Sequence, residues 1–279
     1  MTRVRSARRT ARRVISGFLQ AFGVVGLVLS CLAVFSPGLL VGRWWLLVLG
    51  TASALGWSLS GLRVPSVEQI FQPNFAIRLV EGDLFKQGES AVVGMTTTFD
   101  TLVPDVISRT SVQGAFLSQV YGGSCSRLDQ DLDVALQGRE IVKTIEKPGK
   151  THAYELGTVA VLPGTGEQRY YCAAYAEMDE HNRAQGTISG ILHTLDNVWD
   201  EVDRHNSGEP ICVPLIGQGQ SRIPELTPEV SVRLIAFSFL LRSRRSRVSR
   251  ELRIVVHPTE IKKIDRVEFQ AFLQTIAHT

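Results

Sequence analysis

The sequence has few cysteines, and none of them lies near another. The four form no CxxC pair and no cluster with histidine. Because a metal site needs Cys, His or acidic ligands at short spacings, this absence argues against a metal centre. Isolated cysteines of this kind are typical of reduced, mostly buried thiols in a cytosolic setting. They are Cys31, Cys125, Cys172 and Cys212.

Acidic residues and lysine are absent from residues 1–63, which hold eight arginines. The whole chain has 30 basic and 27 acidic residues, so residues 64–279 keep 22 basic residues against all 27 acids, a formal charge of about −5. The mildly basic total therefore reflects an arginine-rich end on an acidic body and gives no reason to expect nucleic acid as a partner.

Two stretches near the N-terminus lack charge altogether. Residues 14–35 and 44–62 are each long enough, at about 1.5 Å per residue, to cross a hydrocarbon core of about 30 Å. The arginines before the first stretch predict a two-span bacterial inner-membrane protein with both termini in the cytoplasm and the lipid bilayer as a partner. A signal peptide is the alternative, but a second apolar stretch follows. With no acid, lysine or histidine inside either stretch, we expect no proton relay in the membrane.

The remainder alternates strand-like and helix-like segments, with one pair of strands expected as a hairpin around Pro163-Gly164-Thr165-Gly166. This pattern predicts an α/β fold, a three-layer α/β/α domain with a mixed sheet. The predicted organisation is a basic cytoplasmic tail (1–13), a transmembrane helical hairpin (14–63), a linker (64–74) and a ligand-binding domain (75–279).

Polar groups follow three of the predicted strands. Asp83 ends a turn after the strand at 75–80, a threonine-rich loop follows the buried strand at 90–95, and two glycines follow the strand before the helix that begins at Pro228. Ligands bind at such strand ends in open α/β sheets, and a glycine loop before a helix N-terminus suits phosphate. The candidate binding residues are Asp83, Leu84, Thr96, Thr97, Thr98, Phe99, Asp100, Gly217, Gln218, Gly219, Gln220 and Ser221.

Each of these features has a structural alternative. Asp83 could be an ordinary turn aspartate, Asp100 could cap the following helix, and two glycines could form a plain strand-to-helix turn. The histidines have no carboxylate or cysteine at metal spacing, so we interpret them as structural or surface residues.

In this order the three features resemble the macro domain, an ADP-ribose-binding module. Gly82-Asp83-Leu84 matches the turn whose aspartate binds the adenine amino group, and Ile216-Gly217-Gln218-Gly219 matches the glycine loop that holds the diphosphate and distal ribose. The resemblance covers about residues 75–279. Hydrolytic macro domains usually carry an Asn-Ala-Ala-Asn-like loop where this chain has Thr96–Thr101, so the resemblance implies a sensor without catalytic residues or cofactor.

That variant loop and the apolar N-terminal segments are similar to the membrane-anchored ThsA effectors of type II Thoeris anti-phage defence. The resemblance implies that a TIR-domain partner enzyme makes an ADP-ribose-derived signal, such as a histidine conjugate. The macro domain binds this signal, the protein forms homo-oligomers, and the membrane is disrupted. The alternatives are a membrane-anchored ADP-ribosyl hydrolase and a passive membrane-tethered scaffold.

Overall fold

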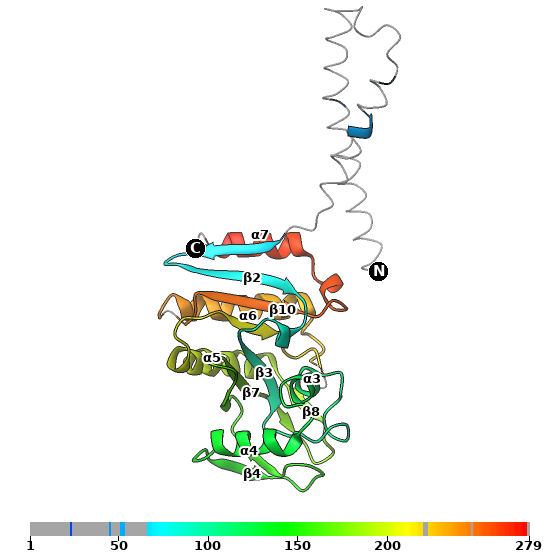
Figure 1. Cartoon of the computed structure of the whole chain (residues 1–279), viewed down its shortest axis with the longest axis vertical. Helices are drawn as coiled ribbons and strands as arrows, with labels where there is room; N and C mark the ends of the chain where they lie inside the picture. Colours follow the sequence, from blue (N-terminus) through cyan, green and yellow to red (C-terminus); the bar gives the residue numbers. More distant parts are fainter. Residues whose placement is uncertain are drawn as a thin grey trace, which may run out of the picture. The chain divides into compact units, whose positions relative to one another are not determined.

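The structure, a computed structural model, describes residues 66–219, 223–246 and 248–277, with residues 23, 45 and 51–53 of the N-terminal part. Its centre is an eight-stranded mixed sheet with the order β1-β2-β10-β9-β3-β7-β6, in which β8 pairs with β7 (Figure 1). Strands β2, β10, β9, β3 and β7 are parallel, whereas β1, β6 and β8 are antiparallel to their neighbours. The strands are β1 (Val67–Phe71), β2 (Phe75–Glu81), β3 (Ser90–Thr96), β6 (Val159–Pro163), β7 (Arg169–Met178), β8 (Ala184–Gly186), β9 (Ile211–Pro214) and β10 (Glu251–Val256).

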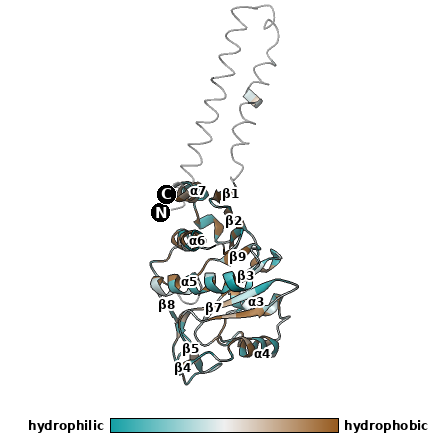
Figure 2. Cartoon of the chain, turned by 90° about the vertical axis from the view of Figure 1, so that its left-hand side faces the viewer, coloured by the Kyte–Doolittle hydropathy of each residue, from teal (hydrophilic) through white to brown (hydrophobic). Residues whose placement is uncertain are grey.

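Helices cover both faces of this sheet. α5, α6 and α7 share one buried apolar cluster with it, which includes Trp199 and Phe239, and α3 and α4 share a second cluster on the other face, which includes Phe116 and Leu128. The helices in Figure 2 carry both colours, and α5 is the clearest case, since its apolar side chains such as Leu195 and Trp199 face the core. The expected three-layer α/β/α domain is therefore confirmed. The helices are α3 (Val112–Gln119), α4 (Cys125–Ala135), α5 (Ile188–His205), α6 (Pro228–Ser243) and α7 (Arg266–Ala277), with short 3₁₀ helices η2 (Leu84–Lys86) and η3 (Ile261–Lys263).

The central strand β3 shows why the sequence forms a doubly covered sheet. Val92 contributes to the cluster under α5, and its neighbours Ala91 and Val93 contribute to the cluster under α3. Successive side chains of a strand point to opposite faces, so an uninterrupted apolar run fits only a strand that is covered on both sides.

No helix in the described part of the chain is both long enough and apolar enough to cross a membrane. The longest described helix, α5, has 18 residues and carries four acidic side chains along its length. This finding overturns the expected two-span architecture and the inner-membrane location. The stretches at 14–35 and 44–62, on which that expectation depended, lie almost wholly outside the described residues.

Two segments differ from the sequence-based prediction. Residues 64–74, expected as a linker, contribute strand β1, so the compact unit begins at Ser66. A separate hairpin of β4 (Ile141–Thr144) and β5 (His152–Tyr154) lies outside the main sheet and was not expected. All four side chains of β4 are exposed, so this strand lacks the alternation that reveals a half-buried strand in a sequence.

Candidate functional site

The five parallel strands bring their carboxyl ends to one edge of the sheet. This edge carries the turn after β2 (Gly82–Asp83), the loop after β9 (215–219) and the loop after β3 (97–100). The topology thus gathers the three features that the sequence singled out. It also adds His257, which follows β10 between the first two and which we had interpreted as structural or surface. No motif surrounds His257, so only the strand order reveals its position.

Asp83 forms a tight turn at the end of β2. The Gly82 N–H donates to the Val256 carbonyl at 3.0 Å, and Asp83 Oδ1 accepts from the Phe85 N–H at 3.0 Å, which caps η2. The second oxygen, Oδ2, accepts from the side-chain amide of Gln119 at 3.0 Å on the exposed side of the turn. Asp83 is therefore a turn aspartate. One of its carboxylate oxygens is held by a backbone N–H, and the other is held only by the side chain of Gln119 on the exposed side.

The loop after β9 contains two glycines, of which the fold requires the first but has room for a side chain at the second. Gly217 has φ +77°, and a Cβ there would lie 2.5 Å from Leu226 Cδ2 and 3.0 Å from Ile191 Cδ1. Around Gly219 no described residue other than its chain neighbours has an atom within 4 Å of the Cβ position. The Gln218 amide donates to the Leu226 carbonyl at 2.6 Å, which fixes that side chain. Gln220 and Ser221 lie outside the described residues.

α6 follows this loop as the sequence predicted. Thr227 caps the helix by accepting from the Val230 N–H, Pro228 occupies the first turn, and Glu229 is acidic there. Ser231 donates to the Ile216 carbonyl at 3.1 Å and so ties the helix start to the end of β9. The helix N-terminus, with its favourable dipole, consequently lies next to the glycine loop.

The loop after β3 is enclosed. Thr96, Thr97, Thr98, Phe99 and Asp100 are all less than 8% exposed. Phe99 adopts φ +49° and packs edge-on against the ring of Tyr154, with the ring centroids 5.7 Å apart. The Tyr154 N–H donates to the Thr97 carbonyl at 2.9 Å, so the β4–β5 hairpin lies directly over this loop.

Asp100 forms a fully buried ion pair. Lys147 Nζ lies 2.8 Å from Asp100 Oδ2, and the side chains of both residues are 0% exposed. Thr98 Oγ1 also donates to Oδ2, the Lys150 N–H donates to Oδ1 at 2.7 Å, and the Gln113 amide donates to the Asp100 carbonyl. Asp100 does not cap the next helix, because Ser111 caps α3. Its charge is instead compensated by a lysine that the sequence analysis missed.

Asp179 adds a carboxylate at the same edge, just after β7. The peptide N–H groups of Arg183 and His181 donate to its Oδ1 at 2.8 and 2.9 Å. These hydrogen bonds, that of Arg183 first, hold the pKa of Asp179 below its usual value.

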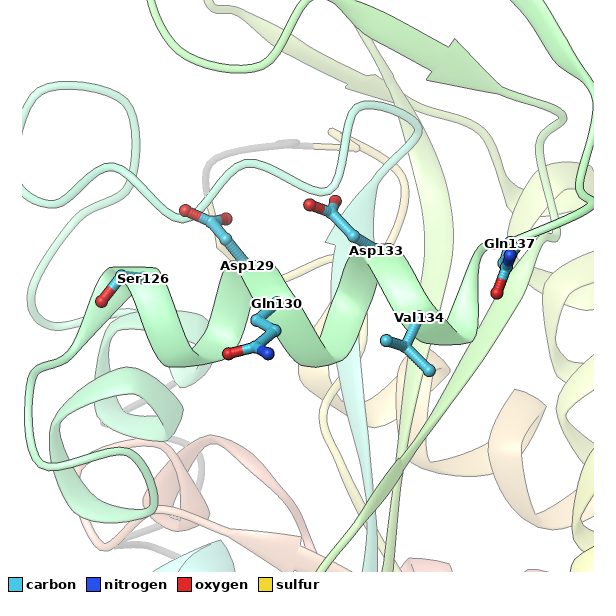
Figure 3. A pocket seen from close by; sticks show the side chains of 6 residues that line it. All are labelled: Ser126, Asp129, Gln130, Asp133, Val134 and Gln137. Carbon is cyan, nitrogen blue, oxygen red and sulfur yellow. The ribbon is translucent and has the colours of Figure 1, made fainter.

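Two hollows lie on helical surfaces of the described domain, and the first borders the loop after β3, because its Asp129 accepts from Thr101 Oγ1 at 2.7 Å. The one in Figure 3 is a shallow depression lined by residues of α4 and the turn after it, among them Asp129 and Asp133. A second hollow of about 270 Å³ lies between α5 and the segment before β6, around Gly157 and Glu201. Ligand sites in open α/β sheets lie at the strand ends, so we place the candidate site at the carboxyl edge rather than in either hollow. Within the described residues, no group of three or more His, Cys, Asp or Glu side chains could hold a metal ion.

Comparison with known proteins identifies the fold. The family model described as "Thoeris protein ThsA, Macro domain" matches residues 77–257. The chain belongs to this family. The resemblance seen in the sequence, which depended on the Gly82-Asp83 turn and the glycine loop, is thereby confirmed at the level of the ThsA macro domain.

One curated relative is the Thoeris protein ThsA of Bacillus amyloliquefaciens (strain Y2). It is 26% identical over 235 residues, which cover 78% of this chain and 77% of that protein. Among solved structures, the Oceanobacillus iheyensis macrodomain with MES bound is similar at a TM-score of 0.50 and 14% identity, covering 76% of this chain and 98% of that one. The same macrodomain with ADP gives 0.50 and 12% identity, over 76% and 97%. These likenesses show that the ThsA macro domain shares the macrodomain fold.

Proposed function

We propose that this chain is the nucleotide-sensing effector of a Thoeris anti-phage system and that its macro domain binds an ADP-ribose-derived signal. The observation that carries the proposal is the match to the ThsA macro domain over residues 77–257. The similar macrodomain solved with ADP supports a ligand that contains an adenosine diphosphate.

The carboxyl edge offers chemistry suited to such a ligand. Asp83 Oδ2 is an acceptor for the adenine amino group once Gln119 gives it up. The peptide N–H groups of the glycine loop are donors suited to the diphosphate oxygens, and the dipole at the start of α6 favours their negative charge. Hydrogen bonds to charged groups contribute about 1.5–3 kcal/mol each, so both contacts would favour an adenine diphosphate.

We infer a sensor rather than a hydrolase. The loop after β3 has threonines, Phe99 and Asp100 where hydrolytic macro domains carry asparagine, and Asp100 is engaged with Lys147. A TIR-domain enzyme is the proposed source of the signal, with a histidine conjugate of ADP-ribose as one candidate. Binding can change the assembly only if the ligand prefers one arrangement over another, so we expect homo-oligomers on ligand binding.

Calorimetric titration of the full chain with ADP-ribose, a histidine conjugate of ADP-ribose and NAD tests the proposal. Saturable binding of an ADP-ribose compound, with a rise in oligomer mass measured by light scattering, is the expected result. Release of free ADP-ribose from an ADP-ribosylated protein would instead favour the hydrolase. A chain that binds none of these nucleotides would rule out the sensor.

A further inference from the structure

The β4–β5 hairpin covers the loop after β3 with very little apolar packing of its own. Among residues 141–154, only Ile145 and Ala153 have buried apolar side chains. The four residues of β4 are exposed. Segments with few buried apolar contacts open at low free energy, so the hairpin is one of the more easily displaced parts of this domain.

The main buried contact of the hairpin is the ion pair between Lys147 and Asp100. The turn 147–150 wraps the carboxylate, with Lys147 Nζ on one oxygen and the Lys150 N–H on the other. Gly149, at φ +89°, permits this approach, because a Cβ there would lie 2.3 Å from Asp100 Oδ1. The hairpin is also held by the Tyr154 N–H bond to the Thr97 carbonyl, whereas the 2.8 Å pair between Lys150 and Asp129 is partly exposed and contributes little.

A buried ion pair adds little net stability, because removing two charges from water costs about as much as their attraction returns. Separating such a pair is costly unless each charge finds another partner or water. A diphosphate at the neighbouring loop supplies that second anion, and phosphate oxygens make charge-assisted hydrogen bonds to lysine as strong as those of a carboxylate. Lys147 therefore has two possible anionic partners.

We propose that the hairpin is a flap that a diphosphate-bearing nucleotide opens by replacing Asp100 as the partner of Lys147. The inference rests on the proposed function, since it concerns the same ligand and the same edge of the sheet. The side chains of Thr97–Asp100 are accessible to a ligand only when the hairpin lifts, because Tyr154 and the turn 147–150 cover them in the closed form. Asp100 then acts as a latch, and Lys147 acts as a ligand-binding residue.

Hydrogen exchange of the full chain, followed by mass spectrometry with and without saturating ADP-ribose, tests the flap. The amides of Lys150 and Tyr154, which donate to Asp100 Oδ1 and the Thr97 carbonyl, report its closure. We expect about tenfold faster exchange of these amides with ligand and slower exchange in the loop after β9. Slower exchange at 215–219 with unchanged exchange at 145–154 would overturn the flap alone. No change in either segment would overturn the proposed function together with the flap.

Substitutions of the latch distinguish a switch from a merely structural pair. Asp100→Asn removes the competing anion and leaves the Lys147 ammonium for the ligand, so ADP-ribose should bind about tenfold more tightly. The double variant Asp100→Asn with Lys147→Met also lacks the latch but lacks the ammonium too, and it should lose that gain. Asp100→Asn leaves the buried Lys147 ammonium without its carboxylate, whereas the double variant buries no unpaired charge, so thermal unfolding of both variants accompanies the titrations.

Lys143→Met is the matched control, because it removes an exposed lysine from β4 of the same hairpin. It should change neither the affinity nor the exchange of the Lys150 and Tyr154 amides. An Asp100→Asn variant that binds ADP-ribose as weakly as the unmodified chain, or more weakly, would overturn the proposal that the ligand replaces Asp100 as the partner of Lys147.

Discussion

The side-chain amide of Gln270 on α7 makes both hydrogen bonds that a neighbouring strand would make to Glu68 on β1. The Glu68 N–H donates to Gln270 Oε1 at 3.0 Å, and Gln270 Nε2 donates to the Glu68 carbonyl at 3.1 Å. An edge strand with free backbone groups is a template for pairing with another chain. Gln270 therefore satisfies this part of the sheet edge within the domain.

Replacing Gln270 by leucine should leave both Glu68 backbone groups without this partner. We expect a loss of about 1–2 kcal/mol in the free energy of unfolding, measured in urea, because two hydrogen bonds are removed at a partly solvated site. We also expect ligand-independent association in light scattering. Gln274→Leu, at an exposed position one turn further along α7, is the control and should do neither. A Gln270→Leu protein that stays as stable and as monodisperse as the control would contradict this role.

Asp83→Ala should weaken ADP-ribose binding by about 10- to 100-fold, because a hydrogen bond to a charged group contributes about 1.5–3 kcal/mol. The loss of the η2 cap should cost about 1 kcal/mol in stability. Calorimetric titration and thermal unfolding separate the two effects. Glu167→Ala, an exposed carboxylate in the β6–β7 turn at the opposite edge, should change neither quantity. Unaltered affinity of the Asp83→Ala protein would remove Asp83 from the site.

Gly219→Val and Gly217→Val should separate binding from folding. A Cβ at 219 meets no atom of the described residues beyond its chain neighbours within 4 Å, so we expect native thermal stability with lost nucleotide affinity. Valine at 217 collides with Leu226 and Ile191 and needs a positive φ, so it should cost about 1–3 kcal/mol or more in addition. Equal destabilisation of the two variants would be inconsistent with this assignment, and so would normal ADP-ribose binding by the Gly219→Val protein.

Burial raises the pKa of the Cys212 thiol to about 12. The unfolded thiol ionises near pH 8.5, so between about pH 8.5 and pH 12 the unfolded state binds fewer protons than the folded state. The free energy of unfolding should therefore fall as the pH rises through this window, and Cys212→Ala should reduce the slope. Peptide mass spectrometry after iodoacetamide at pH 8 should show labelling at half-buried Cys125 before Cys212. Cys212 labelling at the rate of Cys125 in the folded protein would contradict the buried thiol.

Much of the domain could be predicted because local chemistry specifies it. Thr227-Pro228-Glu229 predicted the start of α6, Asp265 accepts from the Val267 and Glu268 N–H groups as a cap of α7, and the apolar run of β3 predicted a strand covered on both faces. The parallel order of the strands then gathers Asp83 and the glycine loop at one edge. These features depend on residues that are close together in the chain.

What could not be predicted depends on distant residues. Lys147 and Asp100 lie 47 positions apart, and nothing in the KPGK turn identifies an aspartate as its partner. The positive φ of Phe99 and the exposed strand β4 also depend on tertiary contacts. The prediction of two spanning helices was wrong for a different reason. It used only the hydropathy and length of the two apolar N-terminal stretches, and no described helix is long enough and apolar enough to cross a membrane.

Helix α3 sets the spacing between the two ends of the proposed site. Its Gln113 holds the Asp100 carbonyl and its Gln119 holds Asp83 Oδ2, so one rigid element contacts both the latch and the adenine turn. Six residues of helix separate these contacts by about 9 Å along its axis. On the proposed function, a nucleotide bound by Asp83 would replace Gln119 as its partner, at one end of the helix whose other end holds the Asp100 carbonyl. Helix α3 therefore connects the turn at Asp83 with the ion pair at Asp100 through contacts at its two ends.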